Sequence, residues 1–383
     1  MVTPTYYEFF AGGGMARAGL GVGWSCLFAN DFDAHKAASY AANWGGDHLR
    51  VGDIHALTAA DLPGRADLAW ASFPCQDLSL AGAGKGLSGA RSGAFYGFAR
   101  LIEALGREFR APGILAIENV VGLLTASGGA DFVALCRALQ ALGYRFGALT
   151  MDSAHFLPQS RPRLFVVAVA RDAPIPAPLS AATAGADWTS TALRRAVDAL
   201  PKALARDWIW WRLPPAPARN GALADLIEEK PADVDWMSRK DVDRLVSLMA
   251  PSHRARLDEV RREGGRAVGA LYRRTRRDET GARVQRAEVR FDGLAGCLRT
   301  PAGGSSRQSI LVVDNGKVRA RLLSGREAAR LMGLPDDYRL PARYNAAYHL
   351  LGDGVAAPVV RFLSEHLLTP LALSRNAPQI AAE

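Results

Sequence analysis

The sequence is poor in cysteine and has no long apolar run. Its four cysteines, Cys26, Cys75, Cys136 and Cys297, lie far apart and form no CxxC pair or Cys/His cluster, which argues against a zinc site and a disulfide framework. No stretch of about 18 apolar residues occurs, and the first ten residues lack the pattern of a signal peptide. These absences predict a cytoplasmic protein with no metal site and no contact with a membrane.

Composition and charge narrow the class further. Hydrophobic residues make up 49% and charged residues 22% of the chain, as in folded globular proteins. With 383 residues the chain exceeds the size at which a single core stops growing, about 250–300 residues, so two lobes are expected. The net charge is +9, and residues 251–290 hold 12 arginines against 6 acidic residues. This excess favours a polyanionic partner, although a solvated helix face would have the same composition.

Short apolar runs alternate with helical patterns over residues 5–170, which predicts a mostly parallel α/β sheet with crossover helices. The predicted strands are Thr5–Phe10, Trp24–Asn30, Leu68–Ser72, Ile114–Glu118 and Arg163–Ala170, and the predicted helices between them are Gly14–Gly19, Ala34–Asn43, Tyr96–Phe109 and Phe132–Leu142.

A proline- and alanine-rich stretch at residues 173–178 can continue neither a strand nor a helix, and it predicts a domain boundary. We therefore expect a first domain over residues 1–175 and a smaller, irregular domain over residues 176–342. A C-terminal segment, residues 343–383, is expected to complete the first domain.

A glycine-rich turn, Phe10–Gly14, joins the first predicted strand to the first helix. Glycines there let the backbone approach a nucleotide-like ligand, although many such turns serve packing alone. Asp31 follows Gly12 by 19 residues, the separation at which an acid can accept hydrogen bonds from ribose hydroxyls. Asp53 ends another predicted strand and could accept from an adenine amino group, or cap the short helix that follows.

The segment Phe73-Pro74-Cys75-Gln76 follows the strand Leu68–Ser72 and precedes a long glycine-rich stretch. A cysteine at the carboxyl end of a parallel strand lies where α/β folds bind their ligands. The alternative is a buried structural cysteine, which is less compatible with the polar, glycine-rich sequence around Cys75. We interpret Cys75 as a nucleophile on a loop.

From this point the chain resembles the DNA cytosine-5 methyltransferase family of bacterial restriction-modification systems, in six motifs that occur in the family's order. They are Phe10–Gly14, Phe73–Gln76, Glu118–Val120, Gln159–Arg163, the Arg326–Arg330 helix and Gly352–Val355. The resemblance covers about the first 175 residues and the last 65. It implies a Rossmann-like S-adenosylmethionine-dependent fold. It also assigns residues 176–342 to a target-recognition domain, in which no motif indicates the DNA sequence that is recognised.

The resemblance also implies the reaction. Cys75 would add to C6 of a cytosine flipped out of duplex DNA, and Glu118 would bind N3 and the exocyclic amine. Arg163 would bind O2 of the cytosine, with Arg161 as a second catalytic arginine. The methyl group of S-adenosylmethionine would pass to C5.

The remaining site residues follow from the same resemblance. Asn119 would fix the loop after its strand. The expected cofactor-binding residues are Phe10, Ala11, Gly12, Gly14, Met15, Asp31, Phe32, Asp53, Ile54, Pro74, Phe95, Asp353 and Val355. The expected DNA-binding residues are Gln76, Ser79, Lys85, Arg273, Arg274, Arg276, Arg277, Arg299 and Thr300. A monomer is expected, with duplex DNA as partner and a restriction endonuclease of the same specificity as a candidate partner.

One departure and two alternatives stay open. Asp353 stands where the family usually has asparagine, and an ionised aspartate accepts hydrogen bonds but cannot donate them. The first alternative is a tRNA cytosine-5 methyltransferase, against which the long basic insert argues. The second is a catalytically silent DNA-binding regulator on the same scaffold, against which the intact Cys75, Glu118 and Arg163 argue.

Overall fold

The computed structural model describes residues 3–73, 93–219, 221–299 and 306–376. They form two compact units. Unit 1 consists of residues 1–152, 162–216 and 359–383, and unit 2 consists of residues 153–161 and 217–358. The chain therefore enters unit 2 twice, once for only nine residues between two strands of unit 1.

Unit 1 is built on a seven-stranded sheet with the order β3-β2-β1-β4-β5-β7-β6. Strands β1 to β5 run parallel, while β7 runs antiparallel to both β5 and β6. The strands are β1 (Thr5–Phe9), β2 (Ser25–Asp31), β3 (Leu49–Val51), β4 (Leu68–Ala71), β5 (Ile114–Val120), β6 (Tyr144–Asp152) and β7 (Pro162–Ala170). A two-stranded ribbon pairs β8 (Ser180–Ala181) with β9 (Trp210–Trp211).

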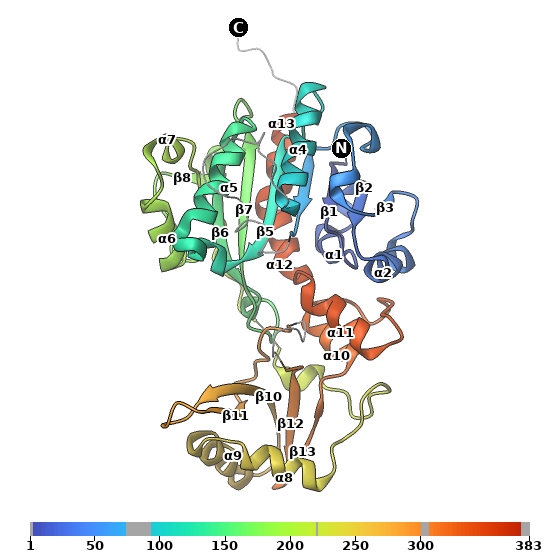
Figure 1. Cartoon of the computed structure of the whole chain (residues 1–383), viewed down its shortest axis with the longest axis vertical. Coiled ribbons are helices and arrows are strands. Elements are labelled where there is room, and N and C mark those ends of the chain that lie inside the picture. Colours follow the sequence, from blue (N-terminus) through green and yellow to red (C-terminus); the bar gives the residue numbers. More distant parts are fainter. Residues whose placement is uncertain (1–2, 74–92, 220, 300–305, 377–383) are drawn as a thin grey trace. The chain divides into compact units, whose positions relative to one another are not determined.

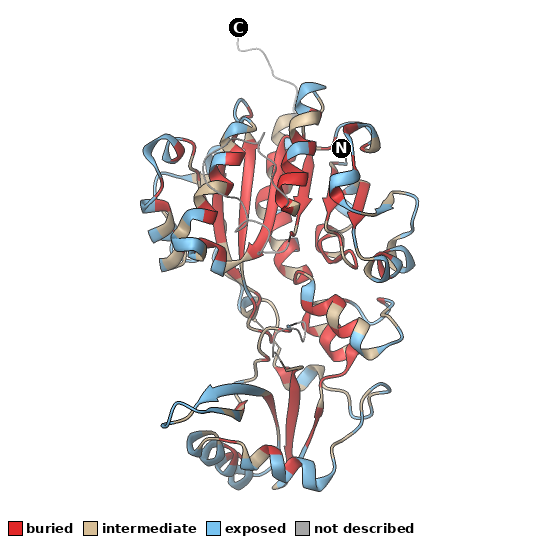
Figure 2. Cartoon of the chain, in the orientation of Figure 1, coloured by how far each residue is buried: buried red, intermediate tan, exposed pale blue. Residues whose placement is uncertain are grey.

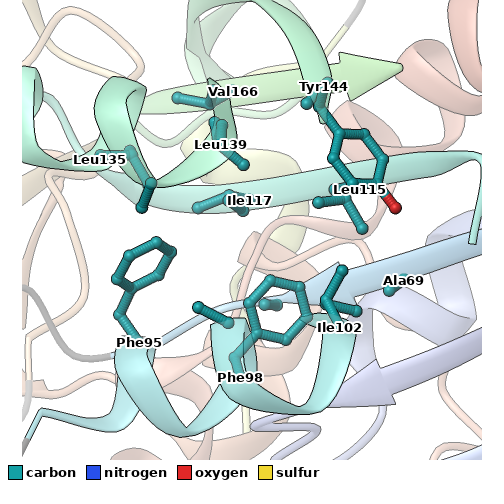
Figure 3. Packing of buried hydrophobic residues seen from close by; sticks show 14 of the residues in the cluster. Ala69, Phe95, Phe98, Ile102, Leu115, Ile117, Leu135, Leu139, Tyr144 and Val166 are labelled. Carbon is teal, nitrogen blue, oxygen red and sulfur yellow. The ribbon is translucent and has the colours of Figure 1, made fainter. Parts of the chain in front are cut away.

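The central strands are buried almost along their whole length, as Figure 2 shows for unit 1. Such continuous apolar runs are typical of parallel strands covered on both faces. On one face, Phe95, Phe98 and Ile102 of the helix Ala94–Arg107 (α4) pack toward Leu115 and Ile117 of β5 (Figure 3). This core fixes the strand ends that carry the site.

The helices of unit 1 are α1 (Met15–Leu20), α2 (Ala34–Trp44), α4, α5 (Ala130–Ala141), α6 (Thr191–Asp198), α7 (Lys202–Ala205), α12 (Ala357–Leu363), which begins at the end of unit 2, and α13 (Thr369–Asn376). Four of them, α1, α2, α4 and α5, lie between strands of the sheet in chain order, and Figure 1 shows α4 and α5 across the sheet. The C-terminal helices are tied to unit 1 by Trp24, whose indole N–H donates to the hydroxyls of Ser364 and Thr369.

Unit 2 contains a four-stranded antiparallel sheet with the order β11-β10-β12-β13. Its strands are β10 (Arg266–Arg277), β11 (Arg283–Arg290), β12 (Ser309–Asp314) and β13 (Lys317–Leu322), and its helices are α8 (Arg239–Ser247), α9 (Pro251–Glu263), α10 (Gly325–Leu331) and α11 (Tyr344–Asp353). Leu245 of α8 and Leu257 of α9 pack on this sheet. A fully buried ion pair, Arg321 to Glu327 at 2.6 Å, joins β13 to α10.

The five predicted strands correspond to β1, β2, β4, β5 and β7, and the mixed α/β fold with a separate smaller domain is confirmed. Two features differ from the expectation. The second unit is not irregular, because it has a regular antiparallel sheet. The units also divide at residues 216 and 358 rather than at 175 and 342, because Trp208 and Trp211 pack against the β6 and β7 hairpin of unit 1.

No helix in the described ranges is both long and apolar enough to cross a membrane.

Candidate cofactor and catalytic site

The turn between β1 and α1 has a backbone that only glycine tolerates at one position. Gly14 has φ +78°, and a Cβ there would lie 2.3 Å from Nε1 of Trp44. That indole N–H donates to the carbonyl of Gly13 at 3.0 Å. Phe10 also has a positive φ of 59°, a strained conformation that is typical of ligand sites. The turn is therefore shaped by the Trp44 side chain, which packs directly against Gly14.

Asp31, at the end of β2, is tied directly to this turn. Its Oδ2 accepts from the backbone N–H of Gly12 at 2.7 Å, and its Oδ1 accepts from that of Asp33 at 2.8 Å. Burial is the largest influence on the Asp31 carboxyl group and raises its pKa. Each carboxylate oxygen keeps a further acceptor site, so the group can also accept hydrogen bonds from ribose hydroxyls.

The residue after Asp31 presents an exposed aromatic ring. Phe32 is 77% exposed, although large aromatic side chains usually lie inside. Beyond β3, Asp53 is exposed and its Oδ1 accepts from the backbone N–H of His55 at 2.9 Å, so it caps the short helix Ile54–Ala56, the structural role that the sequence left open. Its second carboxylate oxygen can accept from a ligand. Ile54 is buried below it.

These features lie on neighbouring strands at one edge of the sheet. Phe9 of β1 pairs with Asn30 of β2, and Asp31 pairs with Val51 of β3. Ala11 and Met15 are buried under the turn. A glycine turn, a ribose acceptor and an exposed ring at the carboxyl ends of parallel strands suit a nucleoside-containing cofactor.

The second cluster is an ion pair between Glu118 of β5 and Arg163 of β7. Nε of Arg163 lies 3.0 Å from Oε1 of Glu118, and the two side chains are only 14% and 9% exposed. The antiparallel register of β5 and β7, in which Val120 pairs with Arg163, brings the two residues together. A largely buried carboxylate that is held by a guanidinium can position and polarise a heterocycle.

Asn119 holds the end of β4 beside this pair, because its Nδ2 donates to the carbonyl of Phe73 at 3.0 Å. Phe73 is the last described residue before the gap at residues 74–92. Six predicted site residues, Pro74, Cys75, Gln76, Ser79, Lys85 and Thr300, lie outside the described residues.

Two predicted roles need correction. Phe95 was expected to meet the adenine, but its ring is fully buried in the core between Phe73 and Phe98, so it supports the site through packing. Arg161 was expected to be catalytic, but it is only 2% exposed. Its guanidinium donates to the carbonyls of Leu298, Gly352 and Gly354, which is a structural arrangement.

The other predicted residues lie in unit 2. Asp353, at the end of α11, is exposed, and Val355 is buried just beyond it. All four predicted arginines of β10, Arg273, Arg274, Arg276 and Arg277, are exposed, as is Arg299. The sequence did not single out Trp44, which shapes the glycine turn, or Glu288, which pairs with two of these arginines. Both contacts depend on tertiary packing and leave no local motif.

Together the sheet, the glycine turn and the acids at the strand ends define the class of protein, an α/β enzyme that binds a nucleoside-containing cofactor. Comparison with known families makes this specific. The model described as C-5 cytosine-specific DNA methylase matches residues 5–369, and the chain belongs to this family. The chain is thus a DNA cytosine-5 methyltransferase that uses S-adenosylmethionine.

Individual relatives agree with this assignment. The type II methyltransferase M.NlaX of Neisseria lactamica is 26% identical over 368 residues, which cover 95% of this chain and 96% of that protein. M.HpaII of Haemophilus parainfluenzae is 25% identical over 388 residues, covering 96% and 90%. In fold, the chain is similar to the S. pombe Dnmt2 methyltransferase, with a TM-score of 0.57, 16% identity and coverage of 96% and 99%.

Proposed function

We propose that this methyltransferase acts on cytosine in duplex DNA with Cys75 as its nucleophile, and that it serves a type II restriction-modification system. The observation that carries the proposal is the Glu118 to Arg163 pair at 3.0 Å, at the sheet edge where β4 ends at Ala71, three residues before Pro74. Similar proteins named type II methyltransferases support the biological setting.

The residues have a chemically coherent division of work. C5 of cytosine is a poor nucleophile until a group adds to C6. The Cys75 thiolate forms a bond to C6 and pushes electron density toward C5. In this step the Glu118 carboxyl group carries a proton that it donates to N3, and its other oxygen accepts from the exocyclic amine, while Arg163 donates to O2 and to Glu118, so that the negative charge that develops on the ring is stabilised. After methylation, C5 loses its proton and the C6–S bond breaks, which restores the thiolate and the aromatic ring.

The cofactor site described above fits S-adenosylmethionine, which supplies an electrophilic methyl group when it is bound. Asp31 would accept from the ribose hydroxyls, Asp53 from the adenine amino group, and the exposed ring of Phe32 would stack on the adenine. A Cβ on Gly12 would meet no described atom within 4 Å, so the space beside this part of the turn is open to the cofactor.

A stacked cytosine exposes neither face of its ring to a thiolate, so the target base must leave the helix. We assign DNA binding to unit 2, because its β10 strand presents four exposed arginines. Their charge complements the phosphate backbone.

Methyl incorporation tests the proposal against its two alternatives. Purified protein and labelled S-adenosylmethionine are incubated with duplex DNA or with tRNA, and bisulfite sequencing maps the product. We expect label at C5 of cytosine in duplex DNA only. Label confined to tRNA would favour the RNA enzyme, and DNA binding without any label would favour the silent regulator.

A further inference from the structure

The exposed ends of β10 and β11 form a two-stranded arm, here defined as residues 272–277 paired with residues 283–288. Figure 1 shows this hairpin projecting from the rest of unit 2. Side chains alternate between the two faces of a strand. Arg274 and Arg276 therefore share one face with Tyr272, whereas Arg273 and Arg277 lie on the other.

The first face carries a carboxylate that the second face lacks. Glu288 pairs across the arm with Tyr272. Its Oε1 lies 2.6 Å from Nε of Arg276, and its Oε2 lies 3.5 Å from Nε of Arg274. The guanidinium of Arg274 also lies 5.2 Å from the centre of the Tyr272 ring. We name this group the Arg274–Glu288–Arg276 clamp.

The second face has arginines without such a clamp. Among the described residues, neither Arg273 nor Arg277 forms an ion pair. Arg277 donates only to the carbonyl of Gly281, at 3.2 Å. The same strand thus holds two pairs of arginines in different electrostatic surroundings, and each pair is a control for the other.

The clamp is better suited to reading a base than to holding a phosphate. A phosphate contact requires positive charge close to the DNA backbone. A carboxylate between two arginines weakens their attraction to a phosphate. Base reading requires a guanidinium held in one orientation. Glu288 engages the Nε side of both arginines and lowers their freedom, while their terminal Nη groups form no hydrogen bond with a described residue. These Nη groups form the donor fork.

A cavity of about 600 Å³ lies beside the arm within unit 2. It is lined by the arm arginines and, from other elements, by Cys297, Arg299, Gln308 and Tyr348. Gln308 is 1% exposed, and in the described part of the chain the Tyr272 hydroxyl lies close to Gln308 and Gly296 without a hydrogen bond of normal geometry to either. Buried polar groups normally have partners, so this cavity suits a polar ligand edge.

We propose that the Arg274–Glu288–Arg276 clamp reads the major-groove edge of guanine in the target DNA, whereas Arg273 and Arg277 contact phosphates. Guanine presents two acceptors, O6 and N7, on this edge, and a guanidinium fork matches both. The inference rests on the proposed function only in taking duplex DNA as the substrate.

A binding selection tests the clamp without depending on catalysis. The full-length protein selects duplexes from a randomised pool, and the bound fraction is sequenced. We expect enrichment of guanine at one or two positions. Arg274→Ala, Arg276→Ala and, to a smaller extent, Glu288→Gln should reduce this enrichment roughly 5- to 100-fold. Arg273→Ala and Arg277→Ala should keep the enrichment and weaken binding equally for all sequences.

A modified base sharpens the test. In duplexes that carry 7-deazaguanine at the enriched position, base pairing is retained but the N7 acceptor is lost. Wild-type affinity should fall about tenfold on this duplex. The affinity of Arg274→Ala or Arg276→Ala, whichever lost the enrichment, should be the same for guanine and 7-deazaguanine. Thermal unfolding of each variant shows that it is folded.

The outcomes separate this inference from the proposed function. Guanine enrichment that survives all three clamp substitutions, or its absence in the wild type, would overturn the clamp. Guanine-selective binding without methyl transfer to DNA would leave the clamp standing and refute the proposed function.

Discussion

Arg161 and Arg163 are two positions apart in the sequence, yet their guanidinium groups have different tasks. Arg163 pairs with Glu118 at 3.0 Å, whereas Arg161 is buried and donates to three backbone carbonyls of unit 2. A charge that faces a carboxylate can act on a substrate. A guanidinium group that donates to backbone carbonyls instead fixes the backbone around Gly352.

This difference predicts opposite phenotypes for the same substitution. Arg163→Lys should lower kcat by about 100-fold, as loss of an oriented donor does, with little change in Tm. Arg161→Lys should destabilise the protein by on the order of 3 kcal/mol, because buried donors and acceptors lose partners. Thermal unfolding and steady-state kinetics on both variants check this. A large Tm loss for Arg163→Lys alone would contradict it.

Asp31 provides a residue-scale test of the cofactor site. Asp31→Ala should raise the KM for S-adenosylmethionine roughly 10- to 100-fold, because hydrogen bonds to a charged acceptor are lost, while DNA affinity should stay within error. Asp31→Asn keeps one acceptor oxygen for the Gly12 N–H and should show an intermediate effect. Unchanged cofactor binding by calorimetry would place the ribose elsewhere.

Strand β1 carries a buried acidic residue one position before its end. Glu8 is 1% exposed in a strand whose other residues are mostly apolar. Burial raises the pKa of Glu8 from its ordinary 4.5 to about 8, opposed by Arg17 and by Tyr40 and reinforced by Asp31. The carboxyl group is therefore neutral in the folded protein over a range in which it is ionised in the unfolded chain.

The sign of the resulting pH dependence follows from linkage. The stability associated with Glu8 is fully present below pH 4.5 and is lost progressively as the pH rises to about 8. Glu8→Gln removes this loss. The free energy of unfolding of the variant should therefore rise relative to that of the wild type as the pH increases from 4.5 to about 8. Urea unfolding at pH 5, 6.5 and 8 measures the difference. A constant difference would show that Glu8 is ionised in the folded state.

Some elements of the site are encoded by local sequence patterns and others depend on distant contacts. The turn at Phe10–Gly14, the strand end at Asp31 and the buried strand of Glu118 were predictable, because local patterns encode them. The sheet of unit 2 was missed because β10 ends in exposed arginines rather than alternating apolar and polar residues. The position of Arg161 was not predictable, since its acceptors lie more than 130 residues away in the sequence.

For the whole molecule, the net charge of +9 predicts how binding responds to salt. DNA affinity should fall steeply with salt as counterions are released. Replacing Arg273, Arg274, Arg276 and Arg277 together by glutamine should lower the slope of log affinity against log salt by about 2, because Arg273 and Arg277 are the two that contact phosphates. Fluorescence anisotropy at several salt concentrations measures both slopes. Equal slopes would mean that the arm is a solvated surface.

Covalent trapping is a direct test of the proposed attack of Cys75 on C6 of the target cytosine. A cytosine with fluorine at C5 cannot lose a proton there, so the C6–S bond cannot break. Wild-type protein with cofactor should form an adduct on such a duplex that survives denaturing electrophoresis. Cys75→Ser should form none, because a serine hydroxyl is almost un-ionised at neutral pH. Cys26→Ser, Cys136→Ser and Cys297→Ser should each still form the adduct. Loss of trapping in one of these variants, with trapping retained in Cys75→Ser, would show that Cys75 is not the nucleophile.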